Sequence, residues 1–189
     1  MYNKGPAITE IDWLPSNVEI IELPNVGCES HTYLYHMISK RNCLAEKTLF
    51  VPASFQSLYY KRGMMVVLMK WLPSYDYGFS CLPCVVDLKT DFNDFSLSRY
   101  QHSSKANHAI DTQLVQCADR PFGTWYEKNF NNLHVKLSGT QGMFFVTRDK
   151  IMAHDASEYC QLIAYVDKDR NPEAGHYMER AWTALYLGE

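Results

Sequence analysis

The stretch Leu23-Pro24-Asn25-Val26-Gly27-Cys28-Glu29-Ser30-His31-Thr32-Tyr33-Leu34 decides how this chain is expected to fold. Before it, residues 18–23 alternate apolar and polar side chains, which predicts a strand. After it, apolar residues recur at helical spacing and predict a helix from about Glu29 to Arg41. A strand–turn–helix crossing is where α/β folds commonly place a ligand, and the free N–H groups of the helix start suit a diphosphate. The alternative is an ordinary turn that binds nothing.

Length and composition set the class of protein. The chain has 189 residues, which predicts one domain over 1–189 with a sizeable core. The net charge is −3 without a basic run, so nucleic acid is not expected as a partner. We find no signal peptide and no apolar run of about 20 residues, so we expect no membrane association. We therefore predict a cytoplasmic location with six free cysteines.

Apolar periodicity predicts the other elements. Strands are expected at 47–51, 64–69, 84–88, 133–137 and 143–147, with a polar loop over 90–108. The uniformly apolar run at 64–69 is typical of a strand buried on both faces. Helices are expected from Ser54 through Tyr60, over 122–130 and 148–153, after the capping residue Asp155, and at the C-terminal end. The final helix is expected to bury one face: Ala174, Tyr177, Met178, Ala181, Trp182 and Leu185.

Three groups of side chains could carry chemistry, and each has a plain structural alternative. Cys81-Leu82-Pro83-Cys84 is a single C-x-x-C without the following helix that would activate a thiol, so we expect structural cysteines. Asp87, Asp91 and Asp94 could hold Mg²⁺ or Mn²⁺, but a solvated acidic loop is favoured. His31 and His36 are five residues apart and do not share a helix face, so we predict no metal site.

Glu179 lies in the final helix and could act as a general base if it faces a cleft. The alternative is an ion pair with Arg180 or with Arg148.

Several segments together resemble an uncharacterised domain family of fungi, bacteria and large DNA viruses that is related to A-type nucleotide-sugar glycosyltransferases. The resemblance rests on Tyr2-Asn3-Lys4-Gly5, on Pro24–Leu34, on Phe145-Val146-Thr147-Arg148-Asp149-Lys150-Ile151 with Glu158-Tyr159, and on Ala174–Trp182. It implies a single three-layer α/β/α domain with a mostly parallel central sheet, like a truncated glycosyltransferase of type A. It also implies a donor pocket lined by Asn25, Gly27, Glu29, His31 and Arg148, with Glu179 as the catalytic base.

The chain departs from the family pattern in the donor site. A strand that precedes Y-N-K-G in such transferases is missing. Cys28 stands where the pattern has an arginine, which removes a guanidinium suited to a diphosphate. Phe50-Val51-Pro52-Ala53 stands in place of F-L-Q-G, and the metal-binding D-x-D pattern is absent. These departures predict that the chain no longer binds a nucleotide.

Two functions follow from these observations. The first is a non-catalytic glycosyltransferase-like domain that needs no cofactor and acts as a structural or interaction module, for instance as a minor capsid or virion component of a large DNA virus. Its protein partners would bind an open sheet edge or a Tyr-rich surface. The alternative is an active nucleotide-sugar-dependent glycosyltransferase of glycan synthesis that uses Mn²⁺ or Mg²⁺.

Overall fold

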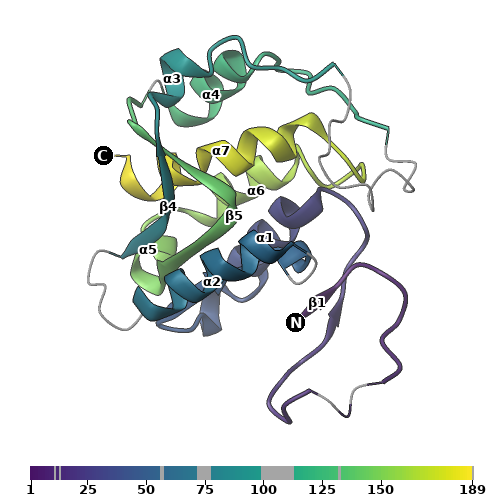
Figure 1. The fold of residues 1–189 in the computed structure, drawn as a ribbon. Coiled ribbons are helices and arrows are strands. Elements are labelled where there is room, and N and C mark those ends of the chain that lie inside the picture. Colours follow the sequence, from purple (N-terminus) through teal and green to yellow (C-terminus); the bar gives the residue numbers. More distant parts are fainter. Residues whose placement is uncertain are drawn as a thin grey trace.

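The structure of this chain is a computed structural model that describes residues 1–10, 12, 14–55, 58–71, 78–98, 113–131 and 133–188. It is a mixed helix and sheet fold (Figure 1). Two short strands, β1 (Tyr2–Asn3) and β2 (Ile21–Glu22), form a separate parallel pair near the N-terminus. The strand predicted over 18–23 is therefore present, but only its last part pairs.

The main sheet has three strands and is antiparallel. The long strand β5 (Leu137–Thr147) lies between β3 (Lys47–Phe50) and β4 (Phe79–Val85). All three strands are in register at Phe144 of β5, which pairs with Phe50 of β3 on one side and with Cys81 of β4 on the other. The prediction of a mostly parallel sheet was wrong. Parallel neighbours need crossover connections, whereas here each edge strand runs opposite to the central one.

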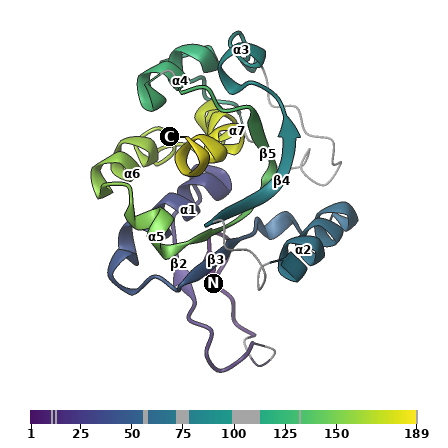
Figure 2. The ribbon, with the colours of Figure 1, turned by 90° about the vertical axis from the view of Figure 1, so that its left-hand side faces the viewer.

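The helices cover the two faces of this sheet unequally. Figure 2 shows α1 (Cys28–Ser39), α6 (Ala156–Ile163) and α7 (Glu173–Leu187) on one side and α2 (Tyr59–Trp71) on the other. The short helices α3 (Leu88–Asp91) and α4 (Phe122–Phe130) lie at one end, and α5 (Arg148–Met152) follows β5 at the other. Two 3-10 turns, Arg41–Cys43 and Ala53–Phe55, complete the described elements.

Aromatic rings fill the space between β5, α1 and α7. Trp182 lies with its ring centroid 5.0 Å from that of Phe144, and Tyr33 lies 4.7 Å from Phe50. All four side chains are at most 6 % exposed. Each buried aromatic removes a large apolar area from water, so this layer supplies much of the stability and fixes α1 and α7 against the sheet.

The helix α2 corrects two predictions. The run Met64–Met69 was expected to be a buried strand and is instead the middle of α2. The helix predicted from Ser54 through Tyr60 begins only at Tyr59 and continues to Trp71. A short apolar run has the same appearance in a buried strand and in a helix. Among the described α2 side chains only Lys61 and Leu68 are buried, so the helix lies on the surface of the sheet.

Other predicted elements are confirmed with shifted ends. The strand at 47–51, the helix at 122–130, the strand at 143–147 and the three C-terminal helices are all present. Asp155 and Glu158 form a capping box at the start of α6. The segment predicted as a strand over 84–88 ends β4 and begins α3, and 133–137 joins β5 only at Leu137. Most of the loop predicted over 90–108 lies outside the described residues.

None of the helices in the described ranges is long and apolar enough to cross a membrane.

Candidate functional site

The candidate site is built around the first turn of α1. Gly27 and Cys28 both have left-handed backbone conformations, with φ of 61° and 47°. The Gly27 N–H donates to the Asp169 carbonyl at 2.7 Å, and the Ser30 hydroxyl donates to the Gly175 carbonyl at 3.4 Å. The chain between α6 and α7 therefore covers the helix start. Two donors at this turn, the Gly27 N–H and the Ser30 hydroxyl, are therefore already bonded to protein.

Lys4 of the N-terminal Tyr2-Asn3-Lys4-Gly5 segment bonds to the same turn. Its ammonium group donates to the carbonyl oxygens of Val26 and Cys28, the latter at 2.6 Å. Burial lowers the pKa of Lys4 to about 8, although the negative charges of Cys28 and Glu29 act to raise it. Two of the segments that carry the family resemblance thus meet in space, and the lysine is committed to backbone carbonyls.

Two glutamates converge on Gly142 of β5. A Cβ atom at Gly142 would lie 3.0 Å from a carboxylate oxygen of Glu29, and the Gly142 carbonyl accepts from the Tyr33 hydroxyl at 3.0 Å. Glu179 of α7 lines a small hollow beside the same glycine. Burial raises the pKa of Glu29, and the charge of Glu179 raises it further. The raised pKa favours a proton on the Glu29 carboxyl group.

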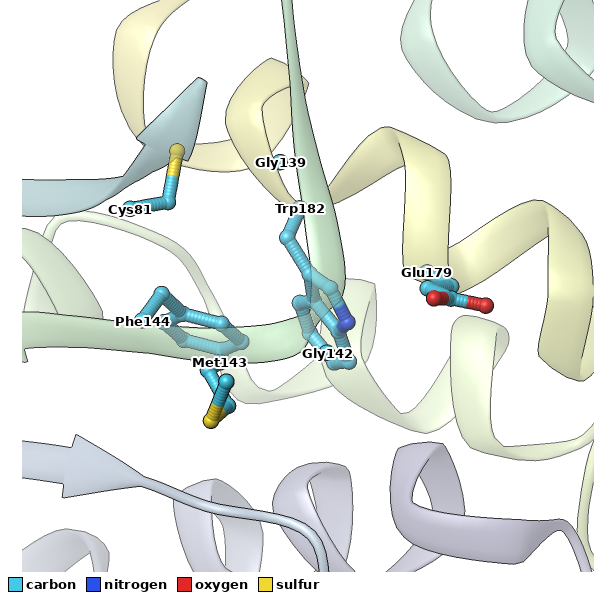
Figure 3. A pocket seen from close by; sticks show the side chains of 7 residues that line it. All are labelled: Cys81, Gly139, Gly142, Met143, Phe144, Glu179 and Trp182. Carbon is cyan, nitrogen blue, oxygen red and sulfur yellow. The ribbon is translucent and has the colours of Figure 1, made fainter. Parts of the chain in front are cut away.

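The hollow itself is small and mostly apolar (Figure 3). It holds about 160 Å³ of empty space that includes open solvent. The indole nitrogen of Trp182 lies on the ring edge that faces Glu179 in this view. Trp182 is 1 % exposed, and within the described part of the chain its N–H has no hydrogen-bond partner. A buried donor without a hydrogen-bond partner costs stability. The other lining residues are Cys81, Gly139, Met143 and Phe144.

The basic side chains Lys61 and Arg180, which lie near the pair, form hydrogen bonds to other groups. Lys61 of α2 is 8 % exposed, donates to the Ser54 hydroxyl at 3.1 Å, and its charge lowers the pKa of Glu29 in part. Arg180, expected as an ion-pair partner of Glu179, instead donates to the His176 carbonyl at 2.8 Å and lies 4.0 Å from the centre of the Phe95 ring. Among the described residues neither Arg180 nor Arg148 forms an ion pair with Glu179.

The predicted donor-site residues separate into two groups. Gly27, Glu29 and Glu179 come together, with His31 packed beneath the turn at 6 % exposure and Asn25 exposed above it. Arg148 does not join them, because it starts α5 beyond the far end of β5, where its N–H bonds to the Glu46 carbonyl. Cys28 is not an activated thiol, since burial raises its pKa to about 12.

The acidic residues that were considered as alternative Mg²⁺ or Mn²⁺ ligands form local hydrogen bonds. Asp87 caps α3 by accepting from the N–H groups of Lys89 and Thr90, and Asp91 accepts from the Asp87 N–H at 2.7 Å. Within the described ranges no three His, Cys, Asp or Glu side chains are placed to hold an ion. Both cysteines of the C-x-x-C are free thiols on β4, one buried and one exposed.

Sequence reasoning missed Lys61, Gly142 and Trp182. Lys61 was on a helix expected to end early, and a buried lysine has no signature in a single sequence. Trp182 was predicted as core, which is correct, but the orientation of its N–H depends on tertiary packing.

Comparison with protein-family models, with curated proteins and with solved structures found no match to this chain.

The pH dependence of folding tests the carboxyl pair. Because the folded pKa of Glu29 is raised, the folded state holds its proton more tightly than the unfolded chain does. This stabilisation is complete below the ordinary value of 4.5 and is lost as pH rises above it. We expect Glu29→Gln to remove a slope of up to about 1.4 kcal/mol per pH unit from the free energy of unfolding in that range. Urea unfolding at a series of pH values measures it.

The exposed Glu127 of α4 offers a matched control. The stability curve of Glu127→Gln should run parallel to that of the unmodified protein. If the Glu29→Gln curve runs parallel as well, Glu29 does not hold a proton in the way described.

Proposed function

We propose that this chain is a glycosyltransferase-like domain that acts as a structural or interaction module, as in a capsid or another assembly, and does not transfer sugar from a nucleotide. The observation that carries this proposal is the chemistry of the α1 turn. Both carboxylates face it, and the two nearby ammonium groups, Lys4 and Lys61, already bond to carbonyl or hydroxyl oxygens. The two carboxylates would repel a diphosphate brought to this turn, and these two ammonium groups are already bonded to protein oxygens.

The size of the hollow supports the same proposal. Pockets for small ligands usually enclose about 300–1,000 Å³. The hollow beside Glu179 has essentially no room for a molecule the size of water, and its 160 Å³ of empty space includes open solvent. A nucleotide-sugar would therefore have to be held mainly outside it.

Titration calorimetry with UDP-, GDP- and dTDP-glucose, each with and without Mn²⁺, tests this proposal. We expect no saturable heat with any donor. Millimolar or tighter binding that requires Mn²⁺ would overturn the proposal, because it would demonstrate a metal-dependent donor site in this chain.

A second candidate function is favoured by the Glu29–Glu179 pair. A partly buried carboxylate without a salt bridge costs stability and is more common at functional sites than in purely structural positions. In a transferase, Glu179 would accept the proton of an acceptor hydroxyl while its oxygen forms the new bond and the donor bond breaks. Trp182 would donate to that hydroxyl oxygen. This candidate predicts release of nucleoside diphosphate from at least one of the three donors.

Two variants test whether this second candidate function is correct. Release that is lost in Glu179→Gln and kept in Glu127→Gln would establish an acid–base site. Release that is absent, or equal in all three proteins, would exclude catalysis through Glu179.

A further inference from the structure

The helix α2 leaves one of its faces uncovered. Tyr59, Arg62, Val66 and Met69 recur at intervals of three and four residues and so lie along one side of the helix. Tyr59 is 81 % exposed, Val66 47 % and Met69 55 %. We call these four residues the α2 face. Apolar side chains gathered in this way on a surface helix are typical of a contact site.

The charges of α2 restrict what can cover this face. The helix contains Lys61, Arg62 and Lys70 and no acidic residue. Lys61 is turned inward, whereas Arg62 and Lys70 are exposed. Two α2 faces placed against each other would bring like charges together, which disfavours a symmetric helix pair. The occupant should therefore carry carboxylates together with apolar side chains.

This chain contains a segment with that character. We call residues 6–20 the arm. Its described residues, 6–10, 12 and 14–20, project away from the helices and sheet in both ribbon views (Figures 1 and 2). The arm contains Glu10, Asp12 and Glu19 and no basic residue, together with Ile8, Leu14, Val18 and Ile20. Its base is held by the ion pair of Glu19 with Lys40 at 3.1 Å. Glu19 and Lys61 are bonded elsewhere in the chain. The charges that could meet are therefore the two negative charges of Glu10 and Asp12 and the two positive charges of Arg62 and Lys70.

We propose that the arm of one copy of this chain docks on the α2 face of a second copy. Exchange in both directions gives a closed dimer with two equivalent contacts, the most common symmetry for a soluble assembly. Apolar side chains of the arm would cover Val66 and Met69, and Glu10 and Asp12 would face Arg62 and Lys70. The pairing rests on the proposed interaction function and names its partner as a second copy of the same chain.

Sedimentation velocity of the whole chain tests the pairing. Across about 1–300 μM at low salt we expect a monomer that converts to a dimer, and the dimer should weaken as salt screens the charges. Arg62→Glu/Lys70→Glu should stay monomeric, and so should Glu10→Lys/Asp12→Lys. An equimolar mixture of these two double variants should recover the dimer, because each arm then meets an α2 face of opposite charge.

The matched control reverses two exposed lysines elsewhere, Lys136→Glu/Lys168→Glu, and should dimerise like the unmodified protein. Circular dichroism confirms that every variant is folded. A chain that stays monomeric at all concentrations, or two charge-reversed variants that dimerise alone, would overturn the pairing. Neither result bears on the proposed function, which the nucleotide-sugar calorimetry decides separately.

Discussion

Replacing Gly27 with alanine is expected to lower the free energy of unfolding by about 3 kcal/mol or more. A Cβ atom there would overlap the Val166 carbonyl oxygen and lie 2.7 Å from the Cβ of His31. The φ of 61° adds a left-handed conformation that costs a residue with a Cβ about 1–2 kcal/mol, and the overlap adds about 1–3 kcal/mol. Urea unfolding followed by circular dichroism measures the loss.

A second glycine provides the matched control. Gly63 lies within α2, and a Cβ atom there would meet nothing within 4 Å. Gly63→Ala should raise the free energy of unfolding by roughly 0.5–1 kcal/mol, because alanine restricts the unfolded chain more than glycine does. Equal effects at the two positions would mean that the α1 turn is not packed as described.

Replacing Glu173 with alanine is expected to cost about 3–5 kcal/mol, since it leaves buried donors without their acceptor. Glu173 is completely buried at the start of α7. Its carboxylate accepts from the N–H groups of Leu97 at 2.6 Å and Cys117 at 2.9 Å, and lies 3.4 Å from the Arg120 guanidinium. One side chain therefore holds two segments that are twenty residues apart in sequence. The same unfolding experiment applies.

Glu173→Gln separates charge from shape at this position. The amide keeps the size of the side chain but loses the charge, so we expect an intermediate loss of about 1–3 kcal/mol. Glu127→Ala, on the exposed side of α4, should change stability by no more than about 0.5 kcal/mol. An alanine variant at 173 that is as stable as the Glu127→Ala control would contradict the burial of this carboxylate.

The C-terminal helices could be predicted from the sequence because their signals are local. The apolar stripe of α7 repeats at helical spacing over fifteen residues, and Asp155 with Glu158 marks the start of α6. The direction of the sheet could not be predicted in this way. The alternation of side chains along β5 is the same whether its neighbours run parallel or antiparallel, and the pairing of Phe144 with Phe50 and Cys81 is a long-range fact.

The candidate site was predicted in its parts and not as a whole. Glu29 and Glu179 were each selected from the sequence, but they are 150 residues apart, and their meeting at Gly142 depends on how α1 and α7 pack on β5. Arg148 was assigned to the site from its motif and lies beyond the other end of the strand. Glu173 escaped notice because a glutamate in the first turn of a helix is ordinary.

Because α2 buries few side chains, it can open or bind a partner without unfolding of the rest of the domain. This helix buries only Lys61 and Leu68 among its described side chains, whereas the middle of β5 is covered on both faces. Amide hydrogens of α2 should therefore exchange for deuterium through local opening, long before those of β5, which require the whole domain to open. A chain built in this way can gain or lose a neighbour at α2 while its central strand stays protected.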